Sequence, residues 1–186
     1  MQQPKSFTPE AVLRGYFDAK DGNRPLLLEE VFASDAELTF RNRSTNIAFP
    51  AFTEGRSSIS EVLVRSFTLS YENVYSFYLQ RPVRVIQEFT CPWLVGMSER
   101  SSGQPRVGCG IYEWAFERRA PHLARRLVVT IEAMQVLPLA ESELVFGWLR
   151  ALNYPWSSPA AALAGIPASE ALIPIAQFLG RHVAVV

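Results

Sequence analysis

The stretch that decides the fold is YFDAKDGNRPLLLEEVFASDAELTF, which runs from Tyr16 to Phe40. It predicts the end of one helix, a stop at Asp21-Gly22, and a second helix that begins at Pro25. A short strand over Ala36–Phe40 should follow, entered through Ala33-Ser34-Asp35-Ala36. This order of elements is typical of an α+β fold in which helices pack on a strongly curved, mainly antiparallel sheet. Such a sheet forms a cone around an apolar pocket.

One predicted helix runs into the start of this stretch, and another is predicted after its end. Thr8 can cap the first helix and Pro9 suits its first turn, and one apolar stripe then follows at helical spacing: Val12, Leu13, Tyr16 and Phe17. Ser58 and Glu61 have the spacing of a capping box, which predicts a third helix that starts there. Its apolar face should hold Ile59, Val62, Leu63, Phe67 and Tyr71. The segment Val74–Leu79 fits a helix and a strand equally well.

From Val83 onwards the pattern changes to that of β-strands. Three long strands are predicted, at about Trp93–Arg100, Arg106–Arg118 and Leu123–Leu137, with hairpin-like connections. We expect residues 1–138 to form the cone domain and residues 139–186 to form a C-terminal helical extension packed on it. In that extension, helices are predicted over Ser142–Leu152 and after Ser169.

The middle strand has two apolar faces. One face carries Tyr112, Trp114 and Phe116, and the other carries Cys109, Ile111, Glu113 and Ala115. A sheet that is apolar on both faces must be covered on both. Helices can cover one face, and we expect a homodimer to cover the outer face, with Trp114 and Phe116 as contacts. The alternative is that the C-terminal tail covers it.

Length and charge set limits on the class of protein. A chain of 186 residues corresponds to one domain. Eighteen basic and eighteen acidic residues give no net charge, which does not favour nucleic-acid binding. The polar N-terminus lacks the apolar core of a signal peptide, and no run reaches the ~18 apolar residues of a membrane span. Two cysteines are too few for a disulfide framework. We therefore expect a cytoplasmic protein with no membrane partner.

The same elements resemble the nuclear transport factor 2-like superfamily, which includes ketosteroid isomerases, scytalone dehydratase and SnoaL-type polyketide cyclases. The resemblance covers roughly Pro9 to Leu137. It is carried, in this order, by Gly15-Tyr16-Phe17, Val31-Phe32-Ala33-Ser34-Asp35-Ala36, Glu54-Gly55-Arg56 and Ile111-Tyr112-Glu113-Trp114. One fold hosts many chemistries, so the resemblance implies the cone and leaves the reaction open.

The isomerase pattern, laid on this sequence, implies two polar partners. The resemblance places the isomerase tyrosine at Tyr16 and the protonated acid that holds the oxyanion at Glu113. The position of the carboxylate base falls in Leu38-Thr39-Phe40-Arg41, which contains no acid. Because the ring of Phe40 cannot accept a proton, the ketosteroid reaction is not expected. Glu132 is the reserve candidate for a base.

Each candidate has a structural alternative. Tyr16 could be a core aromatic, while Glu113 and Glu132 could each be paired with an arginine. If the Glu113 face lines the pocket, desolvation favours the protonated acid. The predicted lining set is Tyr16, Phe40, Phe67, Trp93, Ile111, Glu113 and Glu132.

Two functions follow from these residues. The first is binding of a small, mostly apolar molecule, with cofactor-free acid–base chemistry of the isomerase, dehydratase or cyclase type. The alternative is a non-catalytic homodimeric binding or protein-interaction module. No metal is expected, because the sequence has no His-x-His, no Cys-x-x-Cys and no tight acid cluster. The two functions differ in whether one open cavity reaches both Tyr16 and Glu113.

Overall fold

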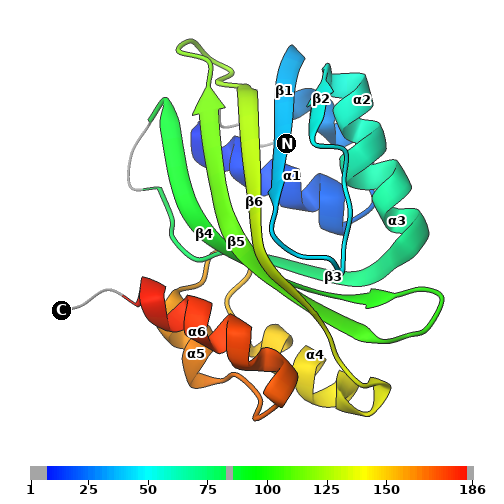
Figure 1. The fold of residues 1–186 in the computed structure, drawn as a ribbon. Coiled ribbons are helices and arrows are strands. Elements are labelled where there is room, and N and C mark those ends of the chain that lie inside the picture. The colour runs from blue at the N-terminus through cyan, green and yellow to red at the C-terminus, as the bar shows by residue number, and fades with distance from the viewer. Residues whose placement is uncertain (1–7, 83–85, 184–186) are drawn as a thin grey trace, which may run out of the picture.

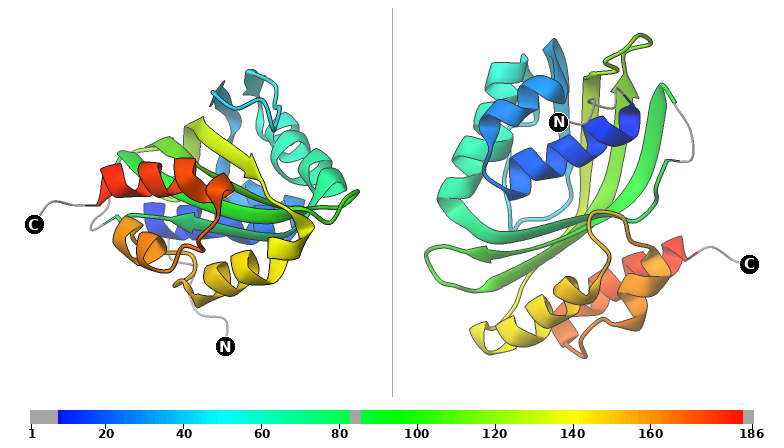
Figure 2. Two further views of the ribbon diagram at one scale, coloured as in Figure 1. Left: turned by 60° about the horizontal axis from the view of Figure 1, so that its bottom comes forward. Right: turned by 180° about the vertical axis from the view of Figure 1, so that it is seen from behind.

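The computed structural model describes residues 8–82 and 86–183, and it has the predicted α+β cone architecture (Figure 1). Its six-stranded sheet has the order β2-β1-β6-β5-β4-β3. Strand β1 runs parallel to β6, and every other pair of neighbours is antiparallel. The sheet curls around the N-terminal helices on its inner face, while the C-terminal helices lie on its outer face (Figure 2).

Helix α1 (Pro9–Asp21) lies across the inner face of the sheet, as the view from behind shows (Figure 2). It begins where the sequence predicts, because the Ala11 amide donates a 3.2 Å hydrogen bond to Thr8 Oγ1. Gly22 ends it. The buried stripe of this helix runs from Val12 to Lys20 and packs into the main core.

The segment after Pro25 differs from the predicted second helix. It forms only a short 3-10 helix, η1 (Pro25–Glu30), and strand β1 (Phe32–Asn42) begins four residues earlier than predicted. The Ala124 amide donates a 2.7 Å hydrogen bond to Val31 O, and Phe32 pairs with Ala124 of β6. Pairing with β6 therefore overrides the helical spacing of the apolar residues in this segment.

The third helix follows a short strand, β2 (Phe52–Glu54), and is made of three consecutive pieces. These are α2 (Arg56–Ser60), a π-helical stretch η2 (Glu61–Ser66) and α3 (Phe67–Ser70). The predicted capping box is wrong, since Gly55 is the N-cap and Ser58 lies inside the first turn. Gly55 has a φ of 85°, which glycine adopts without strain. The ambiguous segment that follows is strand β3 (Tyr71–Tyr78).

The three long strands are present as β4 (Glu88–Glu99), β5 (Pro105–Phe116) and β6 (Ala124–Val136), although β4 begins five residues before the predicted start at Trp93. The backbone comes very close to its neighbours at Gly110 of β5. A Cβ added there would lie 1.9 Å from Thr130 O and 2.8 Å from Cζ2 of Trp93. Glycine at this position thus lets the indole of Trp93 lie against the inner face of β5.

The C-terminal segment covers one end of the outer face (Figure 1). Helices α4 (Ser142–Ala151), α5 (Pro159–Ala164) and α6 (Ile173–His182), with 3-10 turns at Leu139–Glu141 and Glu170–Leu172, form this layer. A second apolar cluster joins them to the strands, through Phe77, Leu94, Val107 and Cys109 on the sheet and Val145, Leu149, Ile175 and Phe178 on the helices. The C-terminal tail therefore covers this part of the outer face. This is the alternative to the predicted homodimer contact.

The expected role of Trp114 and Phe116 in a dimer contact is wrong. Both side chains are 2% exposed and lie on the inner face. The ring of Trp114 is 5.1 Å from that of Tyr16 and 5.9 Å from that of Phe32. These aromatic residues therefore form the core beneath α1. No helix among the described residues is long and apolar enough to cross a membrane.

Candidate functional site

A small apolar cavity of about 50 Å³ lies inside the cone, between α1, the third helix and the inner face of the sheet. Most of its walls are aliphatic, aromatic or thioether side chains, and its one charged neighbour is Lys20 of α1. Its lining consists of Tyr16, Lys20, Phe40, Ile47, Phe49, Leu63, Phe67, Trp93, Val95, Met97, Tyr112, Val129, Ile131 and Met134.

Aromatic side chains fill the rest of the cone. The ring of Tyr112 stacks on Trp93 at 5.4 Å and meets the edge of Tyr16 at 6.0 Å. Burial raises the pKa of the Tyr16 and Tyr112 hydroxyls well above the usual value. Both hydroxyls therefore stay protonated at neutral pH. The Trp93 indole N–H is buried and has no hydrogen-bond partner within the described parts of the chain.

Lys20 brings a buried positive charge to the cavity. Its Nζ donates to Asp21 Oδ1 and to Ser76 Oγ, both at 2.7 Å. The Ser76 hydroxyl and amide donate in turn to Asp21 Oδ1 and Oδ2, each at 2.8 Å. The ammonium also lies 5.3 Å from the ring centre of Phe67, which lines the cavity, in a cation–π contact. This Lys20–Asp21–Ser76 network joins the end of α1 to β3.

A loop over residues 43–51 forms one wall of the cavity. Phe49 on this loop stacks on Phe40 with ring centres 4.2 Å apart. Asn46 holds the loop to the sheet, because its Nδ2 donates a 2.6 Å hydrogen bond to Met134 O and its carbonyl accepts from Arg106. The lining also includes Leu63 of the π-helical stretch, a helix form that is frequent at functional sites.

The structure brings together four of the predicted site residues and separates the other three. Tyr16, Phe40, Phe67 and Trp93 line the same cavity. Ile111, Glu113 and Glu132 are not among its lining residues. The predicted meeting of Tyr16 and Glu113 in one pocket therefore does not occur.

Glu113 lies on the outer face, so the expectation that its face lines the pocket is wrong. It pairs across the sheet with Thr90 of β4 and Val128 of β6. Its carboxylate accepts a 2.7 Å hydrogen bond from Arg41 Nη1, and 37% of its side chain is exposed. The residues before and after it, Tyr112 and Trp114, point inwards because successive side chains alternate along a strand. The arginine-paired alternative is the observed arrangement.

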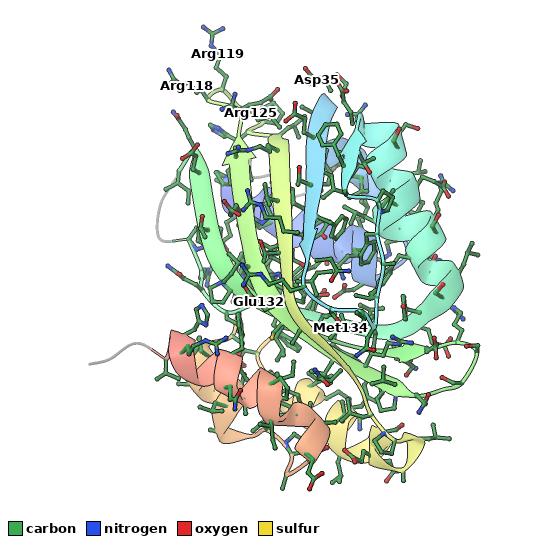
Figure 3. The ribbon with its side chains drawn as sticks, in the orientation of Figure 1. Asp35, Arg118, Arg119, Arg125, Glu132 and Met134 are labelled. Atoms are coloured by element: carbon green, nitrogen blue, oxygen red, sulfur yellow. The ribbon has the colours of Figure 1, made fainter. Side chains whose placement is uncertain are left out.

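Glu132 is also on the outer face, for a different reason. The sequence places Glu132 and Met134 on the same side of the last strand. In the structure, Cys109 pairs with Ala133 and Gly110 with Ile131, so Glu132 is the extra residue of a β-bulge. The bulge turns Met134 into the cavity, while Glu132 accepts a 2.8 Å hydrogen bond from Arg43. Figure 3 labels Glu132 and Met134 on this strand. A bulge cannot be read from alternation alone.

The most informative residue that the sequence reasoning missed is Lys20. It follows Tyr16 by four positions and Phe17 by three, so it continues the buried stripe of α1 at helical spacing. That spacing was the available signal, since a lysine on an apolar stripe is rarely buried without a partner. Among the residues that the structure describes, no three His, Cys, Asp or Glu side chains come together as a metal site requires.

Comparisons with known proteins identify the fold. No family model matches the chain, and no curated protein matches it significantly. Among solved structures, a type 2 hexachlorocyclohexane dehydrochlorinase (LinA) aligns with a TM-score of 0.53 and 14% identity, over 68% of this chain and 84% of that one. A ketosteroid isomerase-like protein of Catenulispora acidiphila, in complex with trimethylamine, aligns with a TM-score of 0.51 and 18% identity, over 66% and 85%.

A third structure, a nuclear transport factor 2-like superfamily protein of Salmonella enterica serovar Typhimurium, aligns with a TM-score of 0.51 and 15% identity. The alignment covers 67% of this chain and 88% of that one. The protein therefore has the nuclear transport factor 2-like fold, as the resemblance implies. At these identities the likeness concerns the fold alone.

Proposed function

We propose that the protein binds a small, mostly apolar molecule in the cavity inside the cone. The observation that carries the proposal is the combination of apolar walls with a buried ammonium group and an unpartnered Trp93 N–H. Ligand sites have this composition: predominantly apolar walls and a few placed polar groups.

The size of the cavity limits the ligand. Sites for drug-sized ligands measure roughly 300–1,000 Å³, and about 50 Å³ is far smaller. A molecule of a few non-hydrogen atoms would fit the cavity as it stands. A larger one would require Phe49 to leave its stack on Phe40 and the loop over residues 43–51 to move outwards. Binding is thus proposed to couple to this loop.

Fold neighbours support a small-molecule site. One of them is named as a dehydrochlorinase of hexachlorocyclohexane, and another was solved in complex with trimethylamine. For acid–base chemistry, Tyr16 and Lys20 are the groups at the cavity that could move a proton or hold a developing charge. Glu113 and Glu132 would first have to leave their arginine partners, so the proposal assigns them no step.

The test uses the four tryptophans as reporters. Methylenecyclopentane has six carbon atoms and exceeds the cavity of about 50 Å³, so it should bind with Phe49 displaced from Phe40. In the protein with ¹⁵N-labelled tryptophan, its titration should shift the indole resonance of Trp93 in a saturable way. The resonance of Trp148 should not move, because its Nε1 donates to Ala162 O at 3.0 Å within the outer cluster.

A variant with a smaller cavity is the matched control. Val95→Ile with Val129→Ile adds two methyl groups to the lining and should abolish the shift while the protein stays folded. Equal shifts in both proteins, or shifts of Trp148 alone, would contradict binding in the cone.

The second candidate function, a homodimeric interaction module, rests on the outer face that the C-terminal helices leave uncovered (Figure 1). That face carries the pairs Arg41–Glu113 and Arg43–Glu132. Because a two-fold interface is self-complementary, a surface with both signs of charge can pair with its own copy. Sedimentation equilibrium tests this function. A dimer should dissociate when Arg41→Glu and Arg43→Glu make the face acidic, and a mass of one chain for the unaltered protein would exclude it.

A further inference from the structure

The polar groups at the cavity are matched to only one kind of ligand. Asp21 has no capacity left, because Oδ1 accepts from Lys20 and the Ser76 hydroxyl, and Oδ2 accepts from the Ser76 amide and from Tyr154 at 3.3 Å. The Tyr16 and Tyr112 hydroxyls are uncharged and are weaker acceptors than a carboxylate. A ligand that brings a hydrogen-bond donor would therefore find no strong acceptor among these groups.

Two donors of residues that line the cavity are not fully used by protein acceptors. An ammonium group has three N–H donors, and within the described residues Lys20 uses two of them, on Asp21 and Ser76. The Trp93 N–H has no partner in the same part of the chain. Both side chains line the cavity and both are nearly fully buried. A ligand oxygen with free lone pairs would satisfy the third N–H of Lys20, whereas Nε1 of Trp93 is covered by protein atoms in this structure.

The charge balance at the cavity favours neutral ligands over ions. Lys20 and Asp21 compensate each other within 2.7 Å, so the network as a whole is neutral. A bound carboxylate would add an uncompensated charge to a site whose other walls are apolar, which is strongly unfavourable. A bound ammonium would do the same with the opposite sign.

We infer that the cavity selects small, neutral molecules that carry a hydrogen-bond acceptor and no donor, such as a ketone or an ester, and that Lys20 holds the acceptor. This inference rests on the proposed function. The inference goes beyond the proposed function because it names the class of ligand and the residue that recognises this ligand. Lys20 is a positioning and specificity residue here, because no reaction is assigned to it.

Four probes of similar shape test the inference: cyclopentanone, methylenecyclopentane, cyclopentanol and cyclopentanecarboxylate. Their dissociation constants are measured from the Trp93 indole resonance. We expect cyclopentanone to bind about tenfold more tightly than methylenecyclopentane, since hydrogen bonds to charged groups are stronger than neutral ones. Cyclopentanol should bind more weakly than the ketone, and the carboxylate should not bind measurably.

Two variants assign the preference to Lys20. Lys20→Met keeps a long side chain and should reduce the preference for the ketone to less than about twofold while methylenecyclopentane still binds. If removal of one partner of the buried pair prevents folding, Lys20→Met with Asp21→Asn removes both charges and serves the same purpose. Arg41→Met, on the outer face and outside the loop over residues 43–51, is the control and should bind all four probes like the unaltered protein.

The outcomes separate the two levels of the argument. Equal affinity for the ketone and the hydrocarbon, or a ketone preference that survives in Lys20→Met, would overturn the inference and leave the proposed function intact. Tightest binding of the carboxylate would also overturn it. No saturable shift of Trp93 with any probe would contradict the proposed function itself.

Discussion

Helix α1, on the inner side of the sheet, and the outer face of the sheet each carry an ion pair of the same length, in opposite surroundings. Lys20 and Asp21 lie 2.7 Å apart with side chains 8% and 7% exposed. Arg41 and Glu113 also lie 2.7 Å apart, with side chains 59% and 37% exposed. Water screens the outer pair, whereas the inner pair is buried and hydrogen-bonded to Ser76 and Tyr154. The two pairs have the same contact distance and differ in burial. Burial is therefore what allows Lys20, and not Arg41, to influence which ligand binds.

The largest effect should come from breaking the inner pair. Asp21→Ala leaves the Lys20 ammonium buried without its counter-charge, so the free energy of unfolding should fall by about 3–5 kcal/mol. Urea denaturation monitored by tryptophan fluorescence measures this. Glu113→Ala is the matched control on the outer face. If both variants lose the same stability, the contrast between the two faces is wrong.

A smaller effect is expected where the inner face is most crowded. Gly110→Ala places a methyl group 1.9 Å from Thr130 O, a backbone atom that cannot move alone, and should cost about 1–3 kcal/mol. Gly147 of α4 is the matched control, because a Cβ added there meets no atom within 4 Å. Gly147→Ala should stabilise the protein by up to about 1 kcal/mol through helix propensity. A tolerated Gly110→Ala would mean that Trp93 is not held against β5.

Removing charge on the outer face should change little. Glu113→Gln keeps the size of the side chain and loses only a solvent-screened pair, so stability should change by no more than about 0.5 kcal/mol. The affinity for methylenecyclopentane should be unchanged in the same variant. A loss of binding there would show that Glu113 reaches the ligand, as the comparison with isomerases first implied.

The smallest expected effect concerns the two cysteines, which should not react with a thiol reagent in the native protein. Burial is the main cause that raises the pKa of the Cys109 thiol, to about 12, and it raises the pKa of the Cys91 thiol as well. Both thiols should therefore stay protonated and unreactive towards Ellman's reagent at pH 8, and react after unfolding. Because the unfolded thiols lose their protons near pH 8.5 while the native ones do not, stability should fall as pH rises above that value. Rapid labelling of the native protein would show that one of the two faces opens.

The fold was predictable because it depends on regular signals. The stripe of α1, the three long strands and the hairpin-like connections all follow hydrophobic periodicity, and the structure confirms them. The predictions were wrong where contacts between distant parts of the chain determine the local structure. Phe32 joins β6 and not a helix, and Gly55 begins the third helix in place of Ser58. These outcomes depend on residues far away in the sequence.

The candidate site was predictable only in part. Tyr16, Phe40, Phe67 and Trp93 line one cavity, as residues expected on the inner side of helices and sheet should. The face of Glu113 was ambiguous, because both faces of its strand are apolar, and only the position of α1 resolves it. Glu132 was misplaced because alternation does not reveal a bulge. Lys20 was missed because a charged residue on a buried stripe departs from the usual pattern.

The most direct test of the account is a crystal structure of the protein under xenon pressure, with the xenon located by its anomalous scattering. Dry apolar cavities bind xenon, so the account predicts a peak inside the cone, bordered by Phe40, Phe67 and Trp93. The variant with Val95→Ile and Val129→Ile should lose that peak. Xenon bound only elsewhere, or none inside the cone, would contradict the claim that this cavity accepts a small apolar ligand.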